Sequence, residues 1–294
     1  MKLYKTTIKP TSNFATNFRG DTLFGQICWG IKYLYGKERL ENLVAHHKQK
    51  PFLICSDGFK KDFLPKPKLP KYLLTTDKNK KSKELKKEVW IAYDDLIHGN
   101  FDKAIKDDKK TDEQLIMHNK INRLSGTTGG NGFDPFGVED IVYSDFDVYF
   151  LIDEDVFKQN ELKECLEFVA NHGYGKDVTW GKGRFEFENF ENVDKYLNHV
   201  SNTYMSLNDF NANNTVAKEF YYDVFVRFGK MGFDRANKNP FKKPIMLADF
   251  GAVMVFDELS SKNYVGSVIE NISTVYDDVI HQGYAIAISI KGLS

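Results

Sequence analysis

The sequence has few cysteines, no net charge and no long apolar run in its 294 residues. Its three cysteines, Cys28, Cys55 and Cys165, lie far apart, which argues against a zinc site or a disulfide scaffold and predicts a reducing compartment. No run reaches the roughly 18 apolar residues of a membrane span, and the opening MKLYKTTIKP is too polar for a signal peptide. We therefore expect a cytoplasmic protein with no membrane partner.

The charge of the chain is balanced overall but unevenly distributed. With 41 basic and 41 acidic residues, composition alone does not indicate nucleic-acid binding. Residues 59–88 carry a local net charge of +7 (11 − 4), whereas residues 139–167 carry −8 (2 − 10). Such opposed regions either hold a polyanion and a basic partner or are ordinary solvated surface. The prolines of LPKPKLP predict an extended surface loop over residues 60–87.

The apolar periodicity over residues 1–192 predicts the order βαββαβ, which is the ferredoxin-like arrangement. In the first helix, Asp21 is the expected N-cap, and Phe24, Ile27 and Ile31 fall on one stripe. Alternation in YSDFDVYFLI predicts a half-buried strand. The expected elements are a strand at 2–9, a helix at 21–36, strands at 113–124 and 143–152, a helix at 160–172 and a strand at 184–190.

Residues 193–294 return to a strand-rich pattern. EFYYDVFVRF and GYAIAISIK alternate, and PIMLADFGAVMVF predicts a sheet segment with Gly251 at a bend. We expect a second, smaller α+β domain over 193–294.

A glycine-rich stretch, GYGKDVTWGKGRFEF, spans residues 173–187 and contains four glycines and three cations. It is not a P-loop, because Gly181-Lys182 is followed by Gly183, and the dinucleotide fingerprint fails at Val178. What remains is a turn whose free amides face phosphate oxygens beside Lys176, Lys182 and Arg184. The alternative is a glycine-rich hairpin with ordinary surface charge.

Several motifs in order resemble one protein family. The helix followed by a loop ending Gly-Lys-Gly-Arg-Phe-Glu resembles the signature of the RAMP superfamily of CRISPR proteins. The succession FRGDTLFGQICWGI, SDGFKKDFLPKPKLP, HNKINRLSGTTG, GYGKDVTWGKGRFE and GYAIAISIK is similar to the Cas5-like subunit-four family of type III-A Csm effector complexes. This resemblance covers nearly the whole chain.

The resemblance implies a non-catalytic subunit with two tandem ferredoxin-like (RRM-like) domains and no cofactor or metal. Such a subunit holds the 5′ handle of the guide RNA (crRNA) and caps the filament. It contacts the large polymerase-like (cyclase-like) subunit on one side and a backbone RAMP subunit on the other. The expected parts are an N-terminal domain over 1–192, with a thumb hairpin at 125–142 and a glycine-rich loop at 173–184, and a C-terminal domain over 193–294.

Candidate RNA-binding residues follow from the motifs. They are Arg19, Asn119, Arg123, Lys176, Gly181, Lys182, Gly183 and Arg184. Arg19 precedes a helix whose free N–H groups favour an anion, with a plain surface arginine as the alternative. Strand alternation is expected to place Asn119 and Arg123 on one face and His118 on the other as a packed or interface residue. Trp180 is expected to pin the hairpin.

Two phenylalanines give the thumb an apolar tip. Phe133 and Phe136 either fold back onto the domain or wedge between nucleotides where the handle meets the guide. The wedge would stop target RNA from pairing into the handle.

Three alternatives remain open: a RAMP-type, metal-independent endoribonuclease, the equivalent type III-B subunit, and a purely protein-binding scaffold. His118, His172 and His281 are chemically able to act as acids or bases, but no pair has a helpful spacing. We therefore expect no catalytic residues.

Overall fold

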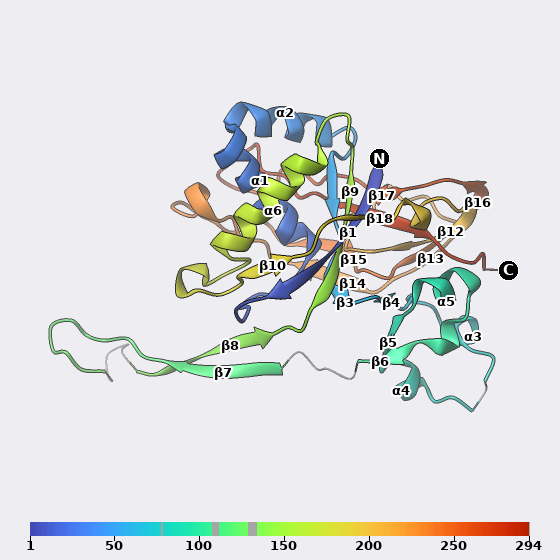
Figure 1. The fold of residues 1–294 in the computed structure, drawn as a ribbon, viewed down its shortest axis with the longest axis horizontal. Coiled ribbons are helices and arrows are strands. Elements are labelled where there is room, and N and C mark those ends of the chain that lie inside the picture. The colour runs from blue at the N-terminus through green and yellow to red at the C-terminus, as the bar shows by residue number, and fades with distance from the viewer. Residues whose placement is uncertain (78, 108–111, 129–133, 294) are drawn as a thin grey trace.

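The computed structural model describes residues 1–77, 79–107, 112–128 and 134–293. Its centre is an antiparallel sheet with strand order β10-β1-β9-β2 (Figure 1). Two short strands pair with it: β3 (Phe59–Lys60) with β9, and β11 (Glu191–Asn192) with β1. The sheet and its helices are β1 (Lys2–Pro10), α1 (Gly20–Tyr35), α2 (Lys37–His47), β2 (Leu53–Cys55), β9 (Phe146–Ile152), α6 (Gln159–His172) and β10 (Phe185–Phe187).

The predicted βαββαβ order is present, but its second strand was misplaced. The central sheet and the helices α1 and α6 follow the order β1-α1-β2-β9-α6-β10, so the second strand is the three-residue β2 and not residues 113–124. The strand predicted as half-buried, β9, is buried along its whole length. Its Phe146, Val148, Phe150 and Ile152 lie in the same core as the helices, while Tyr149 and Leu151 on the other face belong to a second core. The expectation failed because both faces of this central strand are covered.

Helices α1 and α6 cover one face of the sheet. Leu23, Phe24, Ile27 and Ile31 of α1 share a core with four residues of α6: Leu162, Cys165, Leu166 and Val169. The start of α6 is stabilised by Glu161, whose Oε2 accepts the Lys158 amide at 3.0 Å. Asp21 is not the N-cap of α1, because that position is Arg19 and Asp21 lies in the first turn. Within the described residues, no helix combines the length and the apolar content that crossing a bilayer requires.

The C-terminal half forms a second antiparallel sheet with order β13-β16-β12-β18-β17. Leu3, Tyr149 and Leu151 of the first sheet share a core with Met205 and Ile288 of the second. Among the described residues 193–293 there are short 3-10 helices but no α-helix, so this part contains no crossover helix of a second ferredoxin-like module. The strands are β12 (Ser201–Ser206), β13 (Glu219–Tyr221), β16 (Val253–Ser260), β17 (Tyr264–Gly266) and β18 (Tyr284–Ser289).

Two further strands, β14 (Val224–Arg227) and β15 (Ile245–Ala248), form a separate ribbon. EFYYDVFVRF is therefore not one strand, because β13 and β14 belong to different sheets. The predicted bend in PIMLADFGAVMVF is confirmed, with Gly251 between β15 and β16 at φ 76°.

The lysine-rich segment was wrongly predicted as an extended surface loop. It contributes β4 and two short helices to a small unit built on the three-stranded sheet β4-β5-β6. Leu64, Leu69, Leu74 and Leu85 are buried there. Pro65 is tolerated because β4 is an edge strand. The elements are β4 (Leu64–Pro65), α3 (Lys71–Leu74), α4 (Ser82–Leu85), β5 (Glu88–Ile91), α5 (Tyr93–His98) and β6 (Ile105–Lys106).

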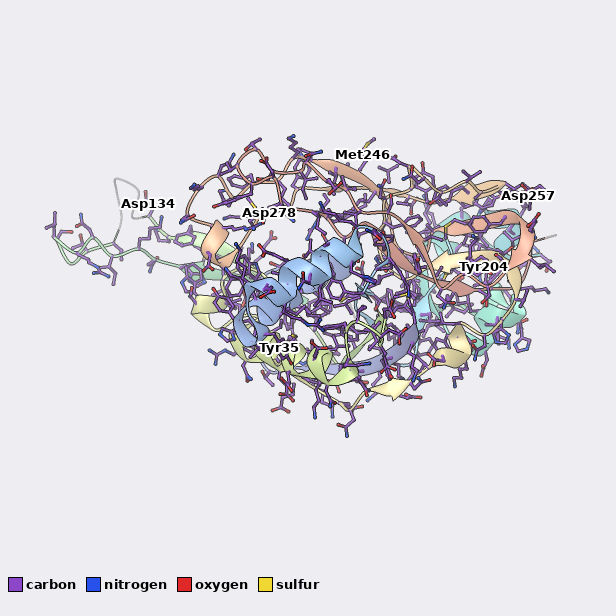
Figure 2. All side chains as sticks on the ribbon, turned by 90° about the horizontal axis from the view of Figure 1, so that it is seen from above. Tyr35, Asp134, Tyr204, Met246, Asp257 and Asp278 are labelled. Carbon is purple, nitrogen blue, oxygen red and sulfur yellow. The ribbon has the colours of Figure 1, made fainter. Side chains whose placement is uncertain are left out.

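A long hairpin projects from the body as its own two-stranded sheet (Figure 1). Its strands are β7 (Asp112–His118) and β8 (Phe136–Val142), paired in register from Asp112↔Val142 to His118↔Phe136. In the second view Asp134 lies on this projection, well away from the body (Figure 2). The hairpin begins earlier than the predicted residue 125, and the strand predicted to reach residue 124 ends at His118.

Candidate nucleic-acid interface

The glycine-rich loop wraps around a segment of its own chain, residues 13–19. The Gly183 amide donates to the Asn13 carbonyl at 2.8 Å, and the Lys176 amide donates to Thr16 Oγ1 at 3.1 Å. The Tyr174 hydroxyl accepts a hydrogen bond of 2.7 Å from the Arg19 amide. The loop therefore holds the connection between β1 and α1 against the end of α6.

The glycines of this loop allow close backbone packing. Gly173 and Gly183 have φ of 99° and 73°, in the left-handed region that favours glycine. A Cβ at Gly183 would lie 2.1 Å from the Tyr174 carbonyl oxygen, whereas a Cβ at Gly181 would meet nothing within 4 Å. The amides of Gly173, Gly181 and Gly183 donate to the Val169, Val178 and Asn13 carbonyls. The expectation of free amides is therefore wrong for these three glycines.

The Lys182 ammonium forms an ion pair with the buried Asp140 carboxylate at the base of the hairpin. Asn13 Nδ2 donates to the same Asp140 oxygen at 3.1 Å. Burial alone would raise the pKa of Asp140, but hydrogen bonds from Lys182 and Asn13 outweigh it and hold this pKa below its usual value. A phosphate contact by Lys182, which stays a prediction, would have to compete with this pair.

Arg19 also lies inside a network of charges. Its Nη1 is 2.8 Å from Asp57 Oδ2 and 2.7 Å from Asp249 Oδ1, and its guanidinium lies 4.4 Å from the centre of the Phe225 ring. Asp57 Oδ1 accepts the Gly20 amide at 2.7 Å. Burial raises the pKa of Asp57 to about 6, although Arg19 opposes that shift. Arg19 thus joins the start of α1 to the turn between β15 and β16, and its predicted RNA contact remains untested.

Four of the predicted RNA-binding residues are exposed. Lys176 and Arg184 lie on the glycine-rich loop, and among the residues with described positions neither makes an ion pair. Asn119 and Arg123 lie beyond the end of β7. The predicted placement of Asn119 and Arg123 on one face of a strand, with His118 on the other, is therefore wrong, because β7 ends at His118. Their side chains belong to the distal part of the hairpin instead.

A stack of rings connects the glycine-rich loop to the hairpin. The His118 ring lies between Trp180, at 4.9 Å, and Phe136, at 5.8 Å between centroids. Lys120 Nζ is 5.5 Å from the centre of the Phe136 ring. Trp180 thus pins the hairpin, as predicted, and the partly exposed Phe136 forms the outer end of the stack. Phe133 lies outside the described residues.

The hairpin base, the glycine-rich loop and the β1–α1 connection enclose a recess of about 310 Å³. Phe14 and Ile141 exchange backbone hydrogen bonds of 2.9 and 2.7 Å beneath it. One cation and one acid line it, so its own charge is balanced. Its lining residues are Ala15, Thr16, Asn17, Glu139, Ile141 and Lys176.

Sequence reasoning missed the contribution of residues 13–17 to this region. The available signal was the run TSNFATN, which places small polar side chains between a strand and a helix. Such residues are common where a backbone must turn and bind. The geometry provides a polar, partly aromatic surface at the root of a projecting hairpin.

The fold is a mixed α/β arrangement of several antiparallel sheets with few helices. No family model and no curated protein matches the sequence. Solved structures do match. A chain of the Csm1–Csm4 cassette in complex with AMPPNP is 15% identical, with a TM-score of 0.63 and full coverage of both chains. The same cassette in complex with cA4 gives 14% identity, again with a TM-score of 0.63 and full coverage.

A second kind of assembly also matches. A chain of the Csm3–Csm4 subcomplex in the type III-A CRISPR–Cas interference complex is 18% identical, with a TM-score of 0.57. The match covers 98% of this chain and 99% of that one. Csm4 is the component that these assemblies share. The fold resemblance indicated by the sequence motifs is therefore confirmed over the full chain.

Proposed function

We propose that the chain is a Csm4-type, non-catalytic subunit of a type III-A CRISPR effector complex and binds the 5′ handle of the guide RNA. The full-length fold similarity to chains of Csm1–Csm4 and Csm3–Csm4 assemblies carries this proposal. In this role the chain joins a large polymerase-like subunit to a backbone RAMP subunit at one end of the filament. The cytoplasmic location belongs to the same proposal. So does the tandem ferredoxin-like organisation, in a reduced form whose second domain keeps an antiparallel sheet without α-helices in its described residues.

The handle is proposed to lie along the recess between the glycine-rich loop and the hairpin. A single-stranded RNA end needs cations for its phosphates and flat faces for its bases. Lys176 lines the recess, and Arg184, on the same loop, is a second exposed cation; neither forms an ion pair among the described residues. The stack that ends at Phe136, with Lys120 above it, supplies an aromatic face on the hairpin side. The hairpin itself would separate the handle from target RNA.

An exposed apolar ribbon supports membership of a larger assembly. Val224, Phe228 and Met246 on and beside β14 and β15 are more than 60% exposed. Figure 2 shows Met246 on the outer surface of the body. Apolar side chains gathered on one surface are typical of a protein-binding site. We therefore propose this ribbon as a contact with one of the neighbouring subunits.

The endoribonuclease alternative requires a general base and a general acid beside one RNA phosphate. The three histidines considered for this role lie in different surroundings. His118 is stacked between two rings, His172 Nδ1 is 2.9 Å from the Phe168 carbonyl on the surface of α6, and His281 is buried. This geometry favours binding over cleavage.

Incubating the purified chain with end-labelled, handle-containing RNA distinguishes the three classes. Retention of intact RNA supports the proposal, and cleavage of the RNA supports the nuclease. If the RNA is neither retained nor cleaved, the result supports a protein-binding scaffold. An RNA with a scrambled handle is the matched control. The double variant Lys176→Ala and Arg184→Ala should lose retention, whereas Lys37→Ala, an exposed lysine on α2, should not.

Co-purification with the products of neighbouring genes distinguishes the type III-A from the type III-B assignment. Recovery with a cyclase-like large subunit and type III-A backbone subunits is expected. Recovery with type III-B subunits would redirect the assignment without changing the RNA-binding result.

A further inference from the structure

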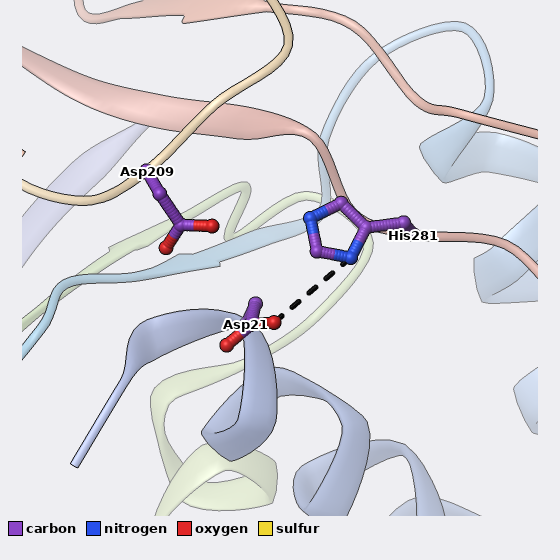
Figure 3. Close-up of side chains that lie close together, drawn as sticks. All are labelled: Asp21, Asp209 and His281. Atoms are coloured by element: carbon purple, nitrogen blue, oxygen red, sulfur yellow. Dashed lines mark ion pairs between the residues drawn. The ribbon is translucent and has the colours of Figure 1, made fainter. Parts of the chain in front are cut away.

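Three polar side chains from distant parts of the chain meet inside the protein. Asp21 lies in the first turn of α1, Asp209 follows β12, and His281 precedes β18. One ligand atom from each lies within 4.8 Å of the other two. Figure 3 shows the two carboxylates and the imidazole ring converging on one space. No spacing in the sequence predicts this group, because its members are separated by much of the chain.

The cluster is buried and its polar atoms are incompletely satisfied. Asp209 is 0% exposed, and neither of its carboxylate oxygens has a hydrogen-bond partner among the described residues. His281 is 5% exposed, and within the same part of the chain its Nε2 atom also has no hydrogen-bond partner. Burying a carboxylate without a partner costs several kcal/mol, so a bare Asp209 is expensive. These unpartnered atoms point to a cation that would bind between them.

None of the neighbouring cations that the structure describes pairs with Asp209. Arg227 binds Asp21, with Nε 2.6 Å from Oδ2 and Nη2 3.1 Å from Oδ1. The Arg19 guanidinium is held by Asp57 and Asp249. Lys242 Nζ donates to the Ile280 carbonyl at 3.4 Å and forms no ion pair within the part of the chain that the structure describes.

We propose that Asp21, Asp209 and His281 bind a divalent transition-metal ion, with Zn²⁺ preferred to Mn²⁺ and Mg²⁺. One imidazole nitrogen and two carboxylate oxygens are ligands that Zn²⁺ accepts, and at such a site Zn²⁺ binds more tightly than Mn²⁺. Asp21 has enough oxygen lone pairs to bind both Arg227 and a metal. Arg227 then orients the Asp21 carboxylate, as outer hydrogen bonds do at metal sites.

The ion is structural in this proposal. It ties the start of α1 to two connections of the C-terminal half, and so stabilises the packing of the two sheets. Its affinity is coupled to folding, because the three ligands come together only in the folded chain. This inference stands apart from the proposed RNA binding and does not depend on it.

The test uses the purified full-length chain, stripped with EDTA, desalted, and then supplied with Zn²⁺, Mn²⁺ or Mg²⁺. After a second desalting, elemental analysis should find one Zn²⁺ per chain, and thermal unfolding should shift upward with Zn²⁺ alone. Asp209→Asn and His281→Gln should each weaken Zn²⁺ binding at least about 100-fold, because even outer-layer changes typically cost 10–100-fold.

Asp147→Asn is the matched control. Asp147 is equally buried, but its carboxylate accepts hydrogen bonds from the Thr7 hydroxyl and the Asp62 amide. This variant should retain the ion. Where a variant fails to fold, the visible spectrum of the wild-type chain loaded with Co²⁺ tests the proposal instead. Nitrogen and carboxylate ligands should change the absorption bands from those of the hydrated ion. Substoichiometric Zn²⁺ in the wild type, a hydrated Co²⁺ spectrum, or undiminished binding by Asp209→Asn would each overturn the proposal.

Discussion

Lys182→Met removes the ammonium that faces the buried Asp140 while it keeps most of the side-chain volume. Removing one partner of a buried ion pair costs about 3–5 kcal/mol, because an uncompensated charge is left inside. Here the Asp140 side chain is 0% exposed and that of Lys182 is 14% exposed. Asn13 would still donate to the same oxygen at 3.1 Å. We therefore expect Lys182→Met to lower the free energy of unfolding by about 3 kcal/mol, near the lower end of that range.

Hydrogen exchange is the sharpest assay of this change, because the pair ties the hairpin base to the body and local opening precedes global unfolding. Amides around Ile141 should exchange faster in Lys182→Met, and amides of β9 that exchange by global unfolding should speed up by no more than the loss of global stability. In a double-mutant cycle with Asp140→Asn, the two changes should be coupled by about 1–3 kcal/mol. Lys37→Met removes an exposed pair with Glu41 and should change stability by less than about 0.5 kcal/mol.

The pH dependence follows from the lowered pKa of Asp140. A carboxyl group whose pKa is lowered by folding stabilises the protein above its unfolded pKa, about 3.9, and loses that contribution as pH falls through the folded pKa. The difference in free energy of unfolding between wild type and Lys182→Met should therefore have its full size at pH 7 and should shrink at pH values below about 4. Equal exchange rates at pH 7, or a cycle without coupling, would refute the reasoning.

Three other predictions concern RNA binding and the glycine-rich loop. Lys176→Ala and Arg184→Ala should each reduce the slope of log K against log salt for handle RNA by about 0.7; an unchanged slope would remove that residue from the site. Gly181→Ala should lower the free energy of unfolding by about 1 kcal/mol, because alanine is disfavoured at the left-handed φ of this position. Gly183→Ala should lower the free energy of unfolding by several kcal/mol more, because its Cβ would clash with the Tyr174 backbone. Equal melting temperatures for the Gly181→Ala and Gly183→Ala variants would contradict this packing. Phe136→Ala should abolish the unstacked fluorescence of a base analogue at the handle boundary, and a retained signal would leave the wedge unsupported.

The helices could be predicted because their evidence is local. The stripes of α1 and α6 repeat every three or four residues, and both helices pack on those stripes. Strand β2 escaped prediction because three consecutive apolar residues show no alternation. The lysine-rich segment misled for another reason. Its lysines dominate the composition, whereas Leu64, Leu69, Leu74 and Leu85 are buried. Their spacing matches neither the helical nor the strand period.

The charged part of the candidate site depended on contacts that no local pattern encodes. Arg19 and Asp249 are far apart in sequence, yet their side chains meet at 2.7 Å. The pairing of Lys182 with Asp140 depends on how the hairpin folds back against the loop. Sequence reasoning could identify Lys176 and Arg184 as cations of the same loop as Lys182. It could not tell which of the three charges is already neutralised within the fold.

The projecting hairpin and the lysine-rich sheet both lie between β2 and β9, neighbours in the central sheet. The connecting segment runs from residue 56 to 145, which is 90 residues (145 − 55). Loop-closure entropy grows only with the logarithm of length, by about 0.6 kcal/mol per doubling. Relative to a connection of about five residues, four doublings cost roughly 2.5 kcal/mol. The hairpin can therefore be lengthened, exchanged or labelled at little further cost to the sheet, which makes it a suitable place for grafted sequences and for probes of its position.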